Sequence, residues 1–96
     1  MTTEELEAMF EKHDDCFLED IPQTRHKRKD IAAFLLLDEL CPSDDGADIV
    51  SGADHDVIYL DPSVEQLAEA NPTEDQVREL IRYGVRIEDD HLEMFA

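Results

Sequence analysis

Lysine and arginine are scarce in this chain: they number eight among 96 residues, against 26 aspartate and glutamate residues, so the formal net charge is −18. Proteins bind free DNA or RNA chiefly by neutralising phosphates with lysine and arginine, so the scarcity argues against direct nucleic-acid binding. Solubility alone needs a net charge of magnitude about 2–8, and a larger charge destabilises the compact state by self-repulsion. Either the surroundings are salty or the negative field is useful, and a useful field indicates a basic protein partner.

Disulfide and membrane signals are also weak. The two cysteines, Cys16 and Cys41, give little support for a disulfide, and we expect free thiols. The N-terminal stretch MTTEELEAMFEKHDD is acidic and lacks the apolar core of a signal peptide. No run approaches the ~18 apolar residues that cross a membrane. We therefore expect a cytoplasmic protein without membrane contact.

The sequence has no recognisable catalytic or metal-binding motif. No nucleophile motif or phosphate-binding loop is present. The clusters at 13–16 and 54–56 lack the two closely spaced ligand pairs of a zinc site, and DDGAD at 44–48 lacks the ligand order of an EF-hand. We predict a non-enzymatic protein with no cofactor and no specific metal site.

Hydrophobic patterning and turn residues predict one domain over residues 1–96, of the α+β class, with about four helices and a small antiparallel sheet. Proline and glycine positions set most of the expected boundaries. The predicted elements are helices at 3–13, 25–40 and 73–83, a short helix opened by Pro62, strands at 49–54 and 56–61, and a last strand at 92–95.

The segment IAAFLLL at 31–37 is apolar all the way round. A helix of this kind is buried on more than one side. We expect helix 25–40 at the centre of the fold, either as a core helix or as a core helix that is also an interface. A domain this small has little surface with which to cover it, so we expect a homodimer whose contact includes part of the set Phe34, Leu36, Leu37 and Leu40.

A basic island precedes this segment and holds half of the chain's basic residues: Arg25, Lys27, Arg28 and Lys29. Cations at a helix N-terminus oppose the helix dipole, so the island is not there for helix stability. Three alternatives stay open: internal pairing with acids of the first helix or of the aspartate loop, phosphate binding, and contact with a partner protein.

The first helix is amphipathic, since Leu6, Met9 and Phe10 share one face and glutamates occupy the opposite side. Carboxylates at helical spacing lie about 5 Å apart along the axis, a density similar to the one charge per ~3.4 Å on each DNA strand. Nucleic-acid mimicry would place such acids in the basic groove of a nucleic-acid-binding protein. The acids expected to contact a partner are Glu4, Glu7, Glu11, Asp14, Asp15, Asp44, Asp45 and Asp48.

In size, in charge and in a chain that stops directly after its last apolar residues, GVRIEDDHLEMFA, the sequence resembles the small acidic accessory proteins of phages and other mobile elements. This class includes anti-CRISPR proteins and other DNA mimics. The resemblance covers the whole chain, carries over no single residue, and implies inhibition of nucleic-acid-binding machinery in the host cytosol. The alternative is a structural or assembly protein that self-associates through the apolar helix.

Overall fold

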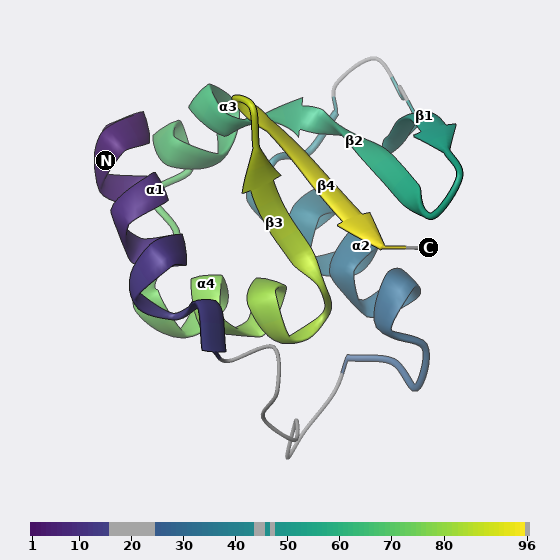
Figure 1. The fold of residues 1–96 in the computed structure, drawn as a ribbon, viewed down its shortest axis with the longest axis horizontal. Coiled ribbons are helices and arrows are strands. Elements are labelled where there is room, and N and C mark those ends of the chain that lie inside the picture. Colours follow the sequence, from purple (N-terminus) through teal and green to yellow (C-terminus); the bar gives the residue numbers. More distant parts are fainter. Residues whose placement is uncertain (16–24, 44–45, 47, 96) are drawn as a thin grey trace.

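The computed structural model describes residues 1–15, 25–43, 46 and 48–95, and these residues form an α+β fold, as the sequence predicts (Figure 1). The described part contains four helices and one four-stranded antiparallel sheet. The helices are α1 (Thr3–Lys12), α2 (Lys29–Leu40), α3 (Val64–Glu69) and α4 (Glu74–Arg82). The strands are β1 (Val50–Asp54), β2 (Val57–Ser63), β3 (Val85–Glu88) and β4 (His91–Phe95).

Three of the helices begin at a capping box, in which an N-cap hydroxyl and a side chain three residues on satisfy each other's backbone N–H groups. The N-caps are Thr2 for α1, Ser63 for α3 and Thr73 for α4. Because Ser63 provides the cap, α3 starts at Val64, and Pro62 belongs to β2 instead of opening the helix.

Helix α2 starts at Lys29, four residues later than predicted, and its N-cap Arg28 makes no side-chain capping bond. The physical reason is that the residues ahead of it are cationic and oppose the helix dipole. Asp30 is the acid of the first turn, and its Oδ1 accepts a hydrogen bond from the backbone N–H of Ile31 at 2.9 Å.

The sheet has the strand order β1-β2-β4-β3, so β1 and β3 are its edges. Strand β3 was not predicted, because its four residues VRIE offer only two apolar side chains. A two-residue turn joins β3 to β4, and its residues Asp89 and Asp90 have positive φ angles of 48° and 65°. Two positive φ angles match the hairpin turn of type I′, in which aspartate is tolerated.

The two faces of the sheet differ in chemistry. On one face, the register aligns Val85, Met94 and Ile58 across three strands, and these side chains pack into the hydrophobic core with residues of all four helices. On the other face, the same register aligns Arg86, Glu93 and Tyr59. Figure 1 shows α2 behind the sheet and α1 beyond β3, while the near face of the sheet carries no helix.

The predicted central position of the apolar helix is not confirmed. Ala33, Leu36 and Leu37 are fully buried in the core, but Leu35 is 49% exposed. The helix therefore covers the sheet from one side and keeps another side in solvent. Leu36 and Leu37 cannot lie at a dimer contact as expected, since the chain's own core already buries them. No helix in the described residues is long and apolar enough to span a membrane.

One member of the basic island is paired inside the molecule. Arg25 donates to Glu79 on α4 and to Glu39 on α2, each at 2.6 Å. The prediction of internal pairing therefore holds for Arg25, but its partners are neither in the first helix nor in the aspartate loop. The hydrogen bond that Arg25 donates to Glu79 and the charges of both glutamates raise the pKa of Arg25, despite its partial desolvation.

Candidate binding groove

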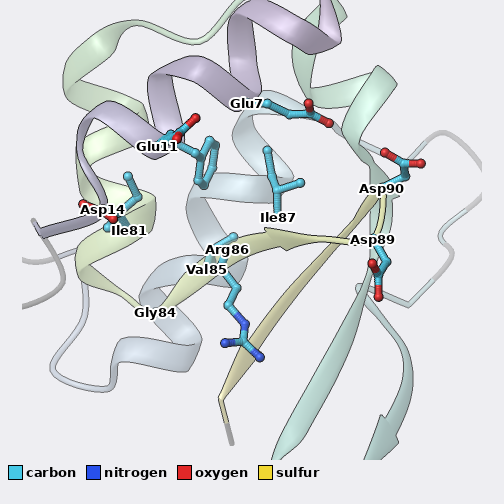
Figure 2. Close-up of a pocket in the computed structure, with 11 residues that line it drawn as sticks. Glu7, Glu11, Asp14, Ile81, Gly84, Val85, Arg86, Ile87, Asp89 and Asp90 are labelled. Atoms are coloured by element: carbon cyan, nitrogen blue, oxygen red, sulfur yellow. The ribbon is translucent and has the colours of Figure 1, made fainter.

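A cavity of about 670 Å³ lies between α1 and β3 (Figure 2). Its apolar lining comes from Phe10 on α1, Ile81 on α4, and Val85 and Ile87 on β3. Figure 2 shows Ile87 pointing from β3 toward α1, while Arg86 points to the opposite side of the strand. We call this space, between α1 and the edge strand β3, the groove.

Carboxylates surround the apolar lining, and we call them the groove carboxylates. On α1, Glu7 lies three residues before Phe10 and therefore on the helix edge where Phe10 enters the groove. Asp14 lies just beyond the helix, after its C-cap His13. From the other side, the β3–β4 turn adds two aspartates. The groove carboxylates are Glu7, Glu11, Asp14, Asp89 and Asp90, and all five are exposed.

No groove carboxylate has an ion-pair or hydrogen-bond partner within the described part of the chain. Five unpaired negative charges beside one apolar surface produce a local negative potential, and cations are attracted to it. The arrangement can hold ammonium or guanidinium groups whose apolar stems lie on the lining. Its lining includes no serine, threonine, cysteine or lysine, and the residues described include no group of three side chains placed to hold a metal ion.

Arg86 also lines the groove, but its charge is committed to Glu93. Its Nε and Nη2 donate to Glu93 Oε1 at 2.6 and 2.5 Å, and His91 Nε2 lies 3.1 Å from Oε2. Glu93 is only 4% exposed. Desolvation raises the pKa of Glu93, but the hydrogen bonds from His91 and Arg86 together lower it below its ordinary value. The Tyr59 ring packs edge-on against His91, with centroids 5.3 Å apart, and completes the cluster.

The acids of α4 are engaged elsewhere. Glu74 Oε1 accepts from Lys12 at 3.0 Å and lies 2.7 Å from His13 Nε2, and the hydrogen bonds from Lys12 and then His13 lower the pKa of Glu74. Glu79 accepts from Arg25 and, at 2.8 Å, from the Tyr83 hydroxyl. Burial, followed by the hydrogen bond to Glu79, raises the pKa of Tyr83.

The eight acids expected at a partner contact do not form one site in the structure. Glu7, Glu11 and Asp14 line the groove, whereas Glu4 and Asp15 are exposed but do not line it. Asp48 is exposed and precedes β1, at the opposite edge of the sheet. The remaining two, Asp44 and Asp45, lie outside the described residues, as does Cys16.

Sequence reasoning missed Asp89 and Asp90, because their approach to α1 is a tertiary contact between chain segments about 75 residues apart. The local signal was the pair of aspartates between two short apolar-containing runs, which suits a hairpin turn. Cys41 is a free, half-buried thiol, and burial raises its pKa, so it is a poor nucleophile.

Comparison of the chain with protein-family models, with curated proteins and with solved structures found no match.

Proposed function

We propose that the protein is a non-enzymatic acidic binding protein that holds a lysine- and arginine-rich segment of a partner protein in the groove. The observation that carries the proposal is a cavity of about 670 Å³ flanked by five carboxylates that have no partner among the residues that the structure describes. Elsewhere in the described chain, acids such as Glu79 and Glu93 are satisfied by cations of the same molecule.

Lysine and arginine suit both halves of this surface. Their aliphatic stems can lie against the partly exposed Ile87, and their charged heads can reach the groove carboxylates. Hydrogen bonds between a cation and a carboxylate are about twice as strong as neutral ones. Complementary charge also raises the association rate and rejects acidic competitors.

Nucleic-acid-binding proteins are the partner class that this proposal favours, because they hold phosphates with clustered lysine and arginine. Along α1, Glu7 and Glu11 are about 6 Å apart, from a rise of 1.5 Å per residue, and Asp14 follows just beyond the helix C-cap. A partner's basic nucleic-acid-binding surface that is occupied by these carboxylates cannot bind DNA or RNA at the same place. The result would be inhibition by nucleic-acid mimicry.

A charge-reversal experiment with a matched control tests the proposal. The probe is a fluorescein-labelled ten-residue peptide of alternating lysine and threonine, measured by fluorescence anisotropy at low and at physiological salt. The groove variant carries Glu7→Lys, Glu11→Lys and Asp14→Lys. The control carries three reversals at exposed acids near the other sheet edge: Asp48→Lys, Asp56→Lys and Asp61→Lys. Each variant has a net charge of −12, since three reversals add six to −18.

We expect the groove variant to lose at least about tenfold in affinity and the control less than about threefold, because close charge pairs couple more strongly than a distant field. Equal losses would mean that the whole surface acts as a diffuse negative field. Absence of binding by the unaltered protein would reject the proposal. Duplex DNA added to the complex should displace the protein from the peptide, because the protein and the DNA would compete for the same basic ligand.

Self-association through α2 is the second candidate, favoured by Leu35, which is 49% exposed next to the partly buried Phe34. Single exposed apolar side chains are common on monomers, so this observation carries less than the groove does. Light scattering of the protein and of Leu35→Lys tests it: a dimer that becomes a monomer in the variant would support assembly through α2.

A further inference from the structure

We propose that the partner segment binds as a fifth strand of the sheet, pairing with the outer edge of β3. This inference rests on the proposed function and adds the conformation and the sequence pattern of the ligand. Extended peptides that join an open sheet edge gain affinity from main-chain hydrogen bonds and specificity from alternate side chains.

The groove wall on the β3 side is formed by backbone as well as side chains. Four consecutive residues, Gly84 to Ile87, line the cavity. Successive side chains of a strand point to opposite faces, so side chains alone could line it only at every second position. Within the described residues, β3 pairs only with β4, so its other edge faces the groove.

The register of the hairpin shows which backbone groups face outward. Glu88 and His91 flank the two-residue turn, and such a turn makes the flanking residues a hydrogen-bonded pair. Hydrogen-bonded and non-hydrogen-bonded pairs then alternate along the ladder. Arg86 therefore bonds to β4, while the N–H and C=O groups of Val85 and Ile87 point into the groove.

The side chains on either side of that edge determine the ligand's pattern. Residues of an added strand that lie on the Ile87 side face Phe10 and the α1 carboxylates, which favours lysine or arginine there. Residues on the Arg86 side face a cation, which favours uncharged side chains. The paired stretch would be about four residues, or ~13 Å, to match β3.

A second copy of this chain does not fit the groove. Pairing β3 with β3 of another copy would bring two sets of five groove carboxylates together, and like charges oppose such an approach. The other sheet edge is less regular, because the register of β1 on β2 shifts between Val50 and Gly52. Bulges of this kind discourage edge-to-edge pairing. The groove carboxylates thus repel a second copy of the chain and attract a basic strand.

Backbone methylation of the peptide probe tests the strand directly. Two versions of the lysine–threonine peptide are compared with the unmodified peptide: one methylated on every lysine backbone nitrogen, the other on every threonine backbone nitrogen. All three have the same length, side chains and charge. In an added strand only one of the two alternate sets of N–H groups faces β3.

We expect one methylated version to bind at least about tenfold more weakly than the unmodified peptide and the other to stay within about threefold. Equal affinities for all three peptides would overturn strand pairing while leaving the acidic groove as the binding site. Equal losses for both methylated versions would also overturn it, since the backbone would then act through its conformation and not through one edge. Failure of the unmodified peptide would instead reject the proposed function itself.

Discussion

The carboxylates of α4 and those around the groove differ in what they touch. Glu74 accepts hydrogen bonds from Lys12 and His13, and Glu79 accepts from Arg25 and from Tyr83 at the C-cap of α4. These contacts join α4 to the end of α1 and to Arg25. Within the described residues the groove carboxylates have no such partner. The two sets of acids therefore have different roles. The α4 acids hold segments of the fold together, whereas the groove carboxylates repel one another and lower the stability of the fold. Acids that cost stability without a structural return are candidates for function.

The largest expected effect concerns the most buried of the paired acids. Arg86→Ala would leave Glu93 desolvated and short of two hydrogen bonds, so we expect the free energy of unfolding to fall by about 2–3 kcal/mol. Urea denaturation at pH 7 measures the loss. Glu88→Gln is the control on the same strand, because Glu88 is exposed, and it should change stability by less than about 0.5 kcal/mol. A stable Arg86→Ala protein would show that Glu93 does not depend on its cation.

Two neutral triples test the comparison itself. Glu39, Glu74 and Glu79 changed to glutamine weaken three sets of ion-pair contacts, so this variant should have a lower melting temperature than the unaltered protein. Glu7→Gln, Glu11→Gln and Asp14→Asn relieve repulsion between like charges on α1 and just beyond it, so this variant should have a slightly higher melting temperature.

Both triples change the net charge from −18 to −15, because each removes three negative charges. The sign of the effect is therefore independent of global charge. The difference should shrink with added salt, as exposed charges become screened. Melting temperatures that move in the same direction would show that the two sets of acids are equivalent.

A smaller effect separates the members of the basic island. Arg25→Gln removes the bridge between Glu39 and Glu79 and should cost about 1 kcal/mol. Lys27→Gln, Arg28→Gln and Lys29→Gln together should cost less at physiological salt, because all three side chains are exposed. Thermal unfolding of both proteins at 20 and 150 mM salt gives the ranking. A larger loss of stability in the triple variant than in Arg25→Gln would show that Lys27, Arg28 and Lys29 are also paired within the molecule.

The smallest effect is the pH dependence contributed by Glu93. Its pKa in the folded protein lies below the ordinary value of 4.5, so its stabilising contribution is complete above that pH and is lost as pH falls through the folded pKa. Glu93→Gln should be less stable than the unaltered protein by about 1 kcal/mol at pH 7. The gap in melting temperature between the two proteins should narrow below pH 4.5. A gap that stays constant down to pH 3 would contradict the linkage.

Local patterns predicted most of the elements but only part of the site. The Thr2–Glu5 spacing with the period of Leu6 and Phe10, and the opening residues Pro72 and Thr73, set two helices within a residue or so of their observed ends. These features act over three or four residues and can therefore be read from one segment. The predicted start of α2 was wrong because Arg25, Lys27 and Arg28 would have opposed the helix dipole, and they lie ahead of the helix instead.

The groove could not be read from any one segment. Its α1 carboxylates followed from helical spacing, but the two aspartates of the turn reach it through the pairing of β3 with β4 and the packing of β3 against α1. Asp48 was grouped with them on charge alone. The strand order places its neighbour β1 at the far edge, a fact that depends on long-range pairing and not on composition.

The strand order also sets how fast each backbone amide exchanges its hydrogen with solvent. Strand β4 has neighbours on both sides, so its amides exchange only when the sheet opens, whereas Val85 and Ile87 direct theirs toward the groove. In the free protein, β3 should therefore show alternation along its length, with fast exchange at positions 85 and 87 and slower exchange at 86. A ligand seated on this edge would slow the two fast positions and leave β1 unchanged. Deuterium uptake resolved by residue would thus record where the edge is occupied, even for a ligand too weak to isolate in complex.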